Sequence, residues 1–394
     1  MSHSHIVAGQ GIIGNIPVAA RRMVSYVFRL RNQLPRRARP PHDLPGPVPL
    51  HQYDDMTTEA IATLDHDDPL FRLLSSDVWP RQLGLPAPPD FEVSKLHPSG
   101  IAYRYADPDS GTAVVGKFFG NKWVHGSQEG NQPLRAMLLQ REFANLQLVQ
   151  ALGFDQGAYQ VVRPLVMEPA INLVLIETAA PGTDLLAAIR AAAFQGAGAR
   201  LRRFLTAVAG WLAALHRRSA INRAVEPVDA ISYFNKLLGQ LRTWDIMDWA
   251  ELARFERLRD RWVASGMLGV AQQALVHGDA TPAHFLYDGT TVTVIDLERL
   301  RAADPAADLG SIAAELRHML SWYKGDAWAG EPYIRHFYAQ YAAHMNLSGP
   351  EFDALTERCR FYMGTTELRI CRNSWVDLSY RRAFLAEAER CLAL

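Results

Sequence analysis

The stretch from Leu275 to Leu309 carries the side chains most suited to chemistry. Its triplet His277-Gly278-Asp279 follows a short apolar run, so Asp279 is expected at the end of a strand, where its carboxylate can face a substrate. His284 lies five positions later and can face the same space. A predicted hairpin then returns the chain through a second apolar run to Asp296. Two potential metal ligands, His284 and Asp296, and one potential base, Asp279, are therefore expected to converge on a short β-ribbon.

This pattern resembles a known family. The order HGD, four residues, His, and then VID resembles the catalytic loop and metal-binding Asp of the aminoglycoside phosphotransferase / choline kinase-like superfamily, whose members are relatives of protein kinases. The run ADPAADLG that follows resembles the GDPxxDL element of the same superfamily. The resemblance implies that Asp279 accepts or orients the proton of an acceptor hydroxyl. It also implies that His284 and Asp296 hold Mg2+, which bridges the phosphates of ATP.

Segments upstream fit the same resemblance, which covers about residues 90–320. Lys117, in the apolar run AVVGKFF, resembles the lysine that holds the α- and β-phosphates of ATP, and Glu142 resembles the helix glutamate that pairs with it. The run LVLIETAAPG resembles the hinge, which implies that backbone groups of Glu177 and Ala179 bind adenine.

The elements that must position these residues change character along the chain. Alternating apolar residues predict a three-strand meander over residues 91–96, 101–105 and 112–119, then a helix ending near Val149 and two strands at 160–166 and 172–178. Beyond Gly182 the pattern is helical, interrupted by short apolar runs between 274 and 297.

The predicted fold class is therefore α+β. The resemblance implies a two-lobed protein kinase-like fold, with a small antiparallel β N-lobe containing one helix and a larger, mostly helical C-lobe. The expected divisions are a basic Pro-rich arm (1–50), a helical or irregular lead-in (51–88), the N-lobe (89–179) and the C-lobe (180–394) with its catalytic loop at 275–298.

Composition narrows the class of protein. The 394 residues include 41 Lys and Arg against 41 Asp and Glu, and this balance argues against a nucleic-acid partner. Three cysteines are too few for a disulfide framework, which favours a reducing compartment. No stretch reaches the roughly 18 consecutive apolar residues that a membrane-spanning helix needs. The sequence thus predicts a cytoplasmic protein.

The first 50 residues leave two interpretations open. Seven arginines face one acid, Asp43, and prolines cluster from Pro35 to Pro49. Residues 18–34 fit a basic amphipathic helix, which would give peripheral contact with the anionic inner face of a membrane. The alternative is a solvated arm without a partner.

Several site assignments also have a structural alternative. Imidazole matches a hard cation less well than oxygen does, so His284 is either a metal ligand or a satisfied structural histidine. Lys117 and Glu142 could form an ion pair without binding ATP. His216 and His318 fit helix packing or capping better than catalysis. The loop of residues 120–133, with Trp123 and His125, either covers the nucleotide or is a surface insertion.

The predicted function is ATP-dependent transfer of a phosphoryl group to a hydroxyl of a small molecule of the aminoglycoside, sugar or amino alcohol type. Residues 284–286 (HFL) and 295–299 (IDLER) also resemble lipopolysaccharide core (Kdo/heptose) kinases, so an envelope-glycan kinase is the first alternative. A catalytically silent kinase-like binding protein is the second.

The C-terminal segment bears on the acceptor. A polycationic aminoglycoside would favour an acid-rich acceptor region by charge complementarity. Residues 351–394 contain seven acids and seven arginines, a balance that argues against a dedicated antibiotic-resistance enzyme.

Overall fold

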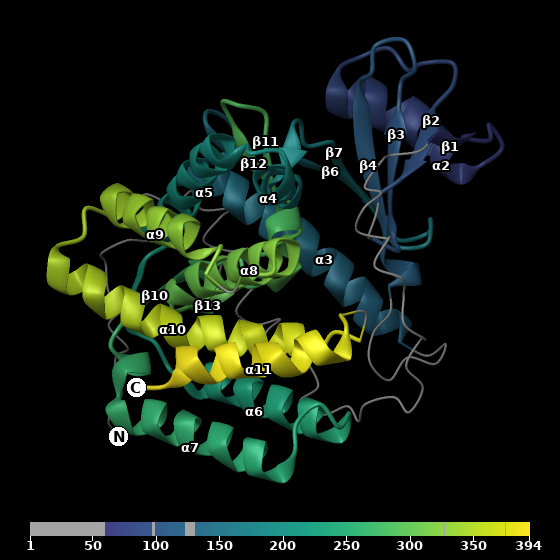
Figure 1. Ribbon diagram of the computed structural model, residues 1–394. Helices are drawn as coiled ribbons and strands as arrows, with labels where there is room; N and C mark the ends of the chain where they lie inside the picture. Colours follow the sequence, from purple (N-terminus) through teal and green to yellow (C-terminus); the bar gives the residue numbers. More distant parts are fainter. Residues whose placement is uncertain (1–59, 97–98, 123–130, 327, 375) are drawn as a thin grey trace, which may run out of the picture.

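The computed structural model describes residues 60–96, 99–122, 131–326, 328–374 and 376–394. In Figure 1 the purple and blue N-terminal part forms a sheet at one corner of the molecule, and the green and yellow helices make up most of the rest. The predicted α+β class, with an antiparallel sheet followed by a helical region, is confirmed.

The N-lobe is built on one six-stranded sheet. Its strands pair antiparallel in the order β1-β2-β3-β4-β7-β6. Their bounds are β1 (Ala60–Thr63), β2 (Glu92–Lys95), β3 (Ala102–Ala106), β4 (Ala113–Phe118), β6 (Pro164–Glu168) and β7 (Val174–Thr178). The predicted meander is confirmed as β2, β3 and β4. Strands β2 and β4 are each one residue shorter at both ends than predicted, and β3 is shifted by one residue.

Helices cover both faces of this sheet. On one face α2 (Pro69–Leu73) and the helical segment Leu74–Leu83 bury Trp79 against Phe91 and the strands. On the other face lies α3 (Gln132–Val149), the predicted N-lobe helix. Because β1 joins the sheet and α2 packs on it, the described part of the lead-in is built into the N-lobe.

One predicted strand is corrected. Residues 160–166 form two strands in different sheets, β5 (Tyr159–Val161) in the C-lobe and β6 in the N-lobe. The chain crosses between lobes at Val162 and Arg163, immediately before Pro164, which has no N–H for a continuous ladder. Periodicity alone does not separate two short strands when only Arg163 and Pro164 stand between their apolar residues.

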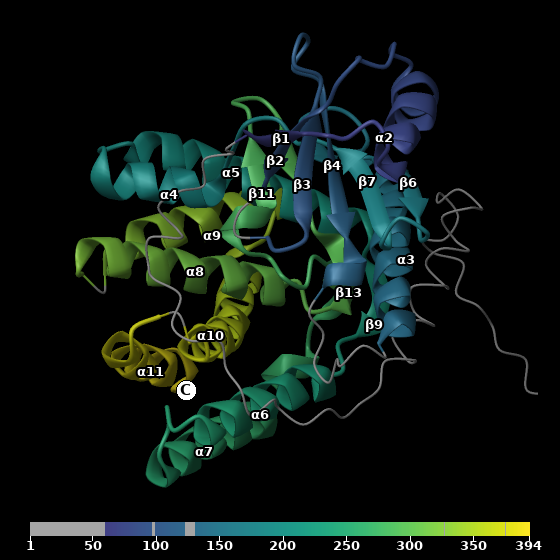
Figure 2. The ribbon, with the colours of Figure 1, turned by 90° about the vertical axis from the view of Figure 1, so that its right-hand side faces the viewer.

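The C-lobe is mainly helical. Its helices are α4 (Leu185–Phe194), α5 (Gly198–Arg218), α6 (Val228–Thr243), α7 (Trp249–Ser265), α8 (Ala306–Lys324), α9 (Glu331–Met345), α10 (Gly349–Cys371) and α11 (Leu378–Leu392). Helix α10 packs against α8, α11 and α6, while α5 packs against α4 and α9. Figures 1 and 2 both place α6 and α7 at the end of the molecule farthest from the N-lobe sheet.

Two small sheets lie among these helices and carry the predicted site. One has the order β13-β10-β9 and the other the order β5-β12-β11-β8, in which β5 and β12 are parallel. Their remaining bounds are β8 (Thr183–Asp184), β9 (Ile221–Ala224), β10 (Gln272–Val276), β11 (Phe285–Tyr287), β12 (Val292–Val294) and β13 (Arg301–Ala303). The predicted hairpin before Asp296 is confirmed as β11 and β12.

A continuous hydrophobic core joins the lobes. It includes Phe119 and Leu175 of the N-lobe, Leu146 of α3 and Trp211 of α5. Within the described ranges, no helix combines the length and the apolar character needed to cross a membrane. The predicted N-terminal arm, residues 1–50, lies outside the described residues.

Candidate active site

A tight turn at the end of β10 presents Asp279. Gly278 has a φ of +80°, and a Cβ at this position would lie 2.3 Å from the carbonyl oxygen of Arg299. Glycine alone tolerates both the left-handed backbone and this close approach. The glycine of the HGD triplet therefore lets the chain turn immediately before Asp279.

A buried carboxylate on α8 anchors the backbone of this turn. Asp308 Oδ2 accepts the N–H of His277 at 2.7 Å, and Oδ1 accepts the N–H of Gly278 at 3.0 Å. Nε2 of His216 lies 3.2 Å from Asp308 Oδ2, and the other ring nitrogen of His216 lies 2.9 Å from the Tyr341 hydroxyl. Burial would raise the pKa of Asp308, but His216, His277 and the N–H of Gly278 together outweigh it, and the pKa is lowered. His216 thus supports the turn through Asp308.

The turn is also tied to the strand that leads to Asp296. His277 is fully buried, and its Nε2 donates to the carbonyl oxygen of Ile295 at 3.2 Å. Its Nδ1 accepts the N–H of Asp279 at 3.4 Å. Burial, followed by the neighbouring His284, lowers the pKa of His277, which favours this neutral form. His277 therefore sets the spacing between the segments that carry Asp279 and Asp296.

Two arginines hold the carboxylate of Asp279. Arg369 Nη1, from α10, lies 3.3 Å from Asp279 Oδ1, and Arg299 Nε lies 3.5 Å from Oδ2. Burial would raise the pKa of Asp279, but Arg299 and Arg369 outweigh it and lower the pKa. Asp279 is therefore ionised at neutral pH.

His284 connects Asp279 to Asp296. It lies in the 3₁₀ turn Pro282–His284, and its Nδ1 donates to the carbonyl oxygen of Asp279 at 2.9 Å. Its Nε2 faces Asp296 Oδ2 at 3.1 Å. Burial lowers the pKa of His284, but Asp296 and Asp279 outweigh it, so the pKa is raised. The two predicted metal ligands are therefore neighbours, and Nε2 is the ring atom available to a cation.

Lys117 of β4 is buried between two glutamates. Its Nζ lies 2.6 Å from Glu142 Oε1 on α3 and 3.1 Å from Glu177 Oε1 on β7. Burial alone would lower the pKa of Lys117, but Glu142 and Glu177 raise it well above its usual value. Burial raises the pKa of both glutamates despite Lys117. The predicted Lys117–Glu142 pair is present, with Glu177 as a second partner.

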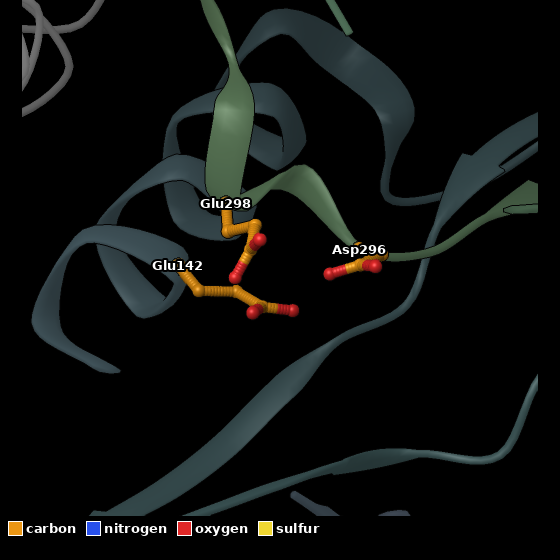
Figure 3. A group of neighbouring side chains, drawn as sticks. All are labelled: Glu142, Asp296 and Glu298. Carbon is orange, nitrogen blue, oxygen red and sulfur yellow. The ribbon is translucent and has the colours of Figure 1, made fainter. Parts of the chain in front are cut away.

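Asp296 lies beside this pair. Figure 3 shows the carboxylates of Glu142, Asp296 and Glu298 turned toward one another, and one oxygen from each lies within 4.8 Å of the others. Asp296 adopts a left-handed φ of 63°, an uncommon backbone for a residue other than glycine that is often found at functional sites. Lys122 forms an ion pair with Glu298. We call Glu142, Glu177, Asp296 and Glu298 the acidic cluster.

The acidic cluster fits a divalent cation. Among the described residues, Lys117 pairs with Glu142 and Glu177, Lys122 and Arg299 pair with Glu298, and His284 pairs with Asp296. Within the same part of the chain, the buried oxygens Oε2 of Glu142 and Oε2 of Glu177 accept no hydrogen bond. Unpaired buried carboxylate oxygens are costly, and oxygen donors are what Mg2+ prefers. Asp296, with His284 beside it, is suited to hold such an ion.

The predicted adenine contacts have a different local structure. Glu177 lies inside β7, paired with Val115 on β4 and Pro164 on β6, so its side chain rather than its backbone reaches the site. The N–H of Ala179 donates to the carbonyl oxygen of Ala113 at 3.3 Å. A hinge contact through this N–H would require that bond to open. Trp123 and His125 lie outside the described residues.

Several side chains at the site are absent from the sequence prediction. Glu298 carried a signal, since it follows Asp296 by two positions in the quoted run IDLER. The sequence points to the backbone of Glu177, and nothing in it indicates that the side chain of Glu177 reaches Lys117. Arg369 lies 90 residues from Asp279, and no local pattern links them.

Comparisons with solved structures found several kinases and phosphotransferases to which this chain is similar. Choline kinase from Cryptosporidium parvum is 11% identical, with 76% of this chain and 88% of that chain covered and a TM-score of 0.50. An ethanolamine kinase from Plasmodium vivax is 12% identical, with coverage of 76% and 81% and a TM-score of 0.49. An aminoglycoside phosphotransferase from Streptomyces rimosus is 18% identical, with coverage of 71% and 92% and a TM-score of 0.44. The likeness to choline kinase confirms the predicted kinase-like fold.

Sequence comparison identifies the family. No curated protein sequence matches the chain. The family model described as phosphotransferase enzyme family (APH) matches residues 131–356, which is more than half of the chain and runs from the start of α3 into α10. The chain belongs to the phosphotransferase enzyme family.

Proposed function

We propose that this phosphotransferase moves the γ-phosphoryl group of ATP to a hydroxyl of a small molecule, with Asp279, Lys117 and Asp296 at the reacting centre. The observation that carries the proposal is a continuous set of contacts between three distant segments. Lys117 pairs with Glu142, Glu142 lies within 4.8 Å of Asp296, and His284 joins Asp296 to Asp279. Separate structural roles would not require these side chains to meet.

Asp279 would orient the acceptor. The acceptor oxygen forms a bond to the γ-phosphorus while the bond to the leaving ADP oxygen breaks, and the hydroxyl proton passes to Asp279 or on to water. The lowered pKa of Asp279 makes it a weak base before transfer. Phosphoryl transfer through a loose transition state needs alignment of the hydroxyl more than early removal of its proton. Asp279 is suited to that task.

Lys117 and the acidic cluster would hold the triphosphate. Lys117, fixed between Glu142 and Glu177, is placed to bind the α- and β-phosphates. Asp296 and His284 would hold Mg2+, and the remaining cluster oxygens lie close by. When bound, this ion neutralises charge on the phosphate oxygens. The base of the nucleotide is proposed to lie against the end of β7 near Glu177 and Ala179.

The acceptor class stays open at this level. The solved relatives are named for choline, ethanolamine and aminoglycosides, and a sugar or amino alcohol acceptor is consistent with the family.

We also propose a cytoplasmic location. An envelope-glycan kinase would need peripheral membrane contact, which would depend on residues 1–50. If the protein sedimented with liposomes equally well with and without these residues, the proposed membrane contact would be ruled out.

The test is release of ADP from ATP and Mg2+ against a panel of sugars, aminoglycosides and amino alcohols. Wild type is compared with Asp279→Asn and with Asp260→Asn, an exposed aspartate on α7 that serves as the matched control. We expect acceptor-dependent ADP release that Asp279→Asn abolishes and Asp260→Asn preserves. The thermal shift with ATP and Mg2+ should persist in both variants, because the nucleotide is held elsewhere. Full activity of Asp279→Asn would refute the assignment.

A further inference from the structure

The acceptor side of Asp279 is lined by cations from three separate elements. We call them the basic cluster: Lys236 on α6, Arg299 in the 3₁₀ turn after Asp296, and Arg369 and Arg372 at the end of α10. Arg299 and Arg369 contact Asp279 directly, at 3.5 and 3.3 Å. The cluster therefore begins at the residue proposed to orient the acceptor hydroxyl.

Helix geometry brings the other two cations to the same place. Arg369 and Arg372 are three residues apart, so they lie on one side of the end of α10. Arg372 Nη1 donates to Gln240 Oε1 at 3.3 Å, and Gln240 is one turn along α6 from Lys236. Tyr233, also on α6, is close enough to interact electrostatically with the arginines of the cluster. The facing sides of α6 and α10 thus extend the cluster away from Asp279.

Carboxylates balance only part of this charge. Arg299 pairs with Asp279 and, at 3.7 Å, with Glu298. Arg369 is shared between Asp279 and Glu315, whose Oε1 lies 2.5 Å from Arg369 Nη2. Among the described residues, Lys236 and Arg372 form no ion pair with any carboxylate. Burial, Arg372 and Arg299 lower the pKa of Lys236. The pKa of Arg372 is lowered by burial and by Arg369 and Arg299, which outweigh the opposing effects of Tyr233 and Asp279. Mutual repulsion of this kind is relieved by an anion.

We propose that the acceptor is a hydroxyl compound that also carries an anionic oxygen group, phosphate or carboxylate, which binds Arg372 and Lys236 while its hydroxyl reaches Asp279. The inference rests on the proposed function and names the substrate class for the same site. Guanidinium groups match both kinds of anion through paired N–H donors. A polycationic or quaternary ammonium acceptor would instead be repelled by the cluster.

The first test uses acceptors that differ only in charge. Glycerol, glycerate, glycerol 3-phosphate and 2-amino-1,3-propanediol form one series, and glucose, glucuronate, glucose 6-phosphate and glucosamine form another. ADP release and thermal shift are measured with ATP and Mg2+ present. We expect an anionic member to exceed the neutral and amino members of its series, and the carboxylate and phosphate arms to show which anion is preferred. A neutral or amino member that matches or exceeds both anions would overturn the proposal.

The second test does not depend on the carbon skeleton. Inorganic phosphate is titrated against wild type, Lys236→Gln, Arg372→Gln and the control Arg261→Gln, an exposed arginine on α7. Phosphate should stabilise wild type and Arg261→Gln, and it should stabilise the two cluster variants less. Equal stabilisation of all four proteins, or of none, would overturn the proposal.

The same variants separate the acceptor from the nucleotide. With an active acceptor, Arg372→Gln should lower kcat/KM for that acceptor roughly 10- to 100-fold, as for loss of a hydrogen bond to a charged group, and leave KM for ATP unchanged. A raised KM for ATP with unchanged acceptor kinetics would assign the cluster to the triphosphate and refute the inference. If ATP and Mg2+ did not raise the melting temperature of the wild-type protein, the proposed function itself would be refuted.

Discussion

The two sides of the site differ in the sign of their uncompensated charge. On the nucleotide side, four carboxylates of the acidic cluster surround two lysines. On the acceptor side, the four cations of the basic cluster share Asp279, Glu315 and, through Arg299, Glu298. Asp279 lies on the boundary, bonded to His284 on one side and to Arg369 on the other. The two proposed ligands, a divalent cation on one side and an anionic group on the other, would each bring charge of the opposite sign.

The half-buried His284 and the buried His318 show the same difference. Burial alone lowers the pKa of any histidine, but at His284 the neighbouring carboxylates of Asp296 and Asp279 reverse the shift and raise it. At His318, on α8, burial and Arg369 act in the same direction and lower the pKa to about 3. The comparison shows that charge placement, rather than burial, distinguishes the two sides of the site.

The largest expected effect comes from neutralising the acidic side at Asp296. Asp296→Asn should lower kcat by about 10²–10⁴-fold, comparable to the loss of a positioned catalytic group, because the proposed ion loses its central ligand. The thermal shift with ATP should also lose its dependence on Mg2+. A Mg2+ titration followed by ADP release and by thermal shift checks both. If Asp296→Asn kept the Mg2+ dependence of the wild-type protein, Asp296 would not be a ligand of the ion.

His284 tests whether the acidic side includes an imidazole ligand. We expect His284→Ala to raise the Mg2+ concentration needed for half-maximal rate and His284→Asn to restore it in part, because the amide oxygen suits the ion. If His284 were only structural, the alanine variant would lower the melting temperature without moving the Mg2+ titration.

A smaller effect is expected at Lys117. Lys117→Ala should raise KM for ATP roughly 10- to 100-fold, since it removes the charged partner of the phosphates. It should also destabilise the fold, because two buried glutamates lose their shared partner. Lys95→Ala on β2 of the same sheet is the control. Unchanged nucleotide kinetics in a folded Lys117→Ala protein would remove Lys117 from the site.

More residues of the acidic cluster than of the basic cluster could be predicted from the sequence. Lys117, Glu142 and Asp296 each stand in a local pattern, an apolar strand, a helix or a hairpin, and each pattern predicts its own backbone. Once the kinase-like fold is assigned, those backbones bring the three side chains together. The strands β2 to β4, the helix α3 and the β11–β12 hairpin were therefore all predictable from the sequence.

The basic side depends on tertiary packing that no local pattern encodes. Arg369 reaches Asp279 only because α10 packs against α8, and Arg372 meets Gln240 only because α10 also packs against α6. Counting seven acids and seven arginines in residues 351–394 gave a balanced segment. The structure instead turns Arg369 and Arg372 toward the site, while Glu389 and Glu387 pair elsewhere. Composition could not show which members of a balanced set face the same way.

A fourth prediction concerns stability and depends on His318. Its folded-state pKa of about 3 lies below its ordinary value of 6.5, so the unfolded chain binds the proton first as the pH falls. The contribution of His318 is therefore complete above pH 6.5 and is lost between pH 6.5 and 3, by about 1.4 kcal/mol per pH unit. Glutamine does not titrate in this pH range. In urea unfolding at pH 7, 6 and 5, the free energy of unfolding of His318→Gln should therefore fall less steeply than that of wild type. Parallel pH profiles would contradict the assigned shift.

The smallest effect we expect is that of salt, and it compares the two sides most directly. Lys236 is exposed and Arg372 half-buried, so their attraction for an anionic acceptor is partly screened, whereas Lys117 is buried and its ion pairs are screened little. Raising the ionic strength from 0.05 to 0.3 M KCl should increase KM for an anionic acceptor roughly two- to fivefold. In Arg372→Gln the increase should be smaller, because part of the attraction is already gone. A neutral acceptor of the same skeleton should show no salt dependence, and if it did, screening would be acting on the nucleotide rather than on the basic cluster.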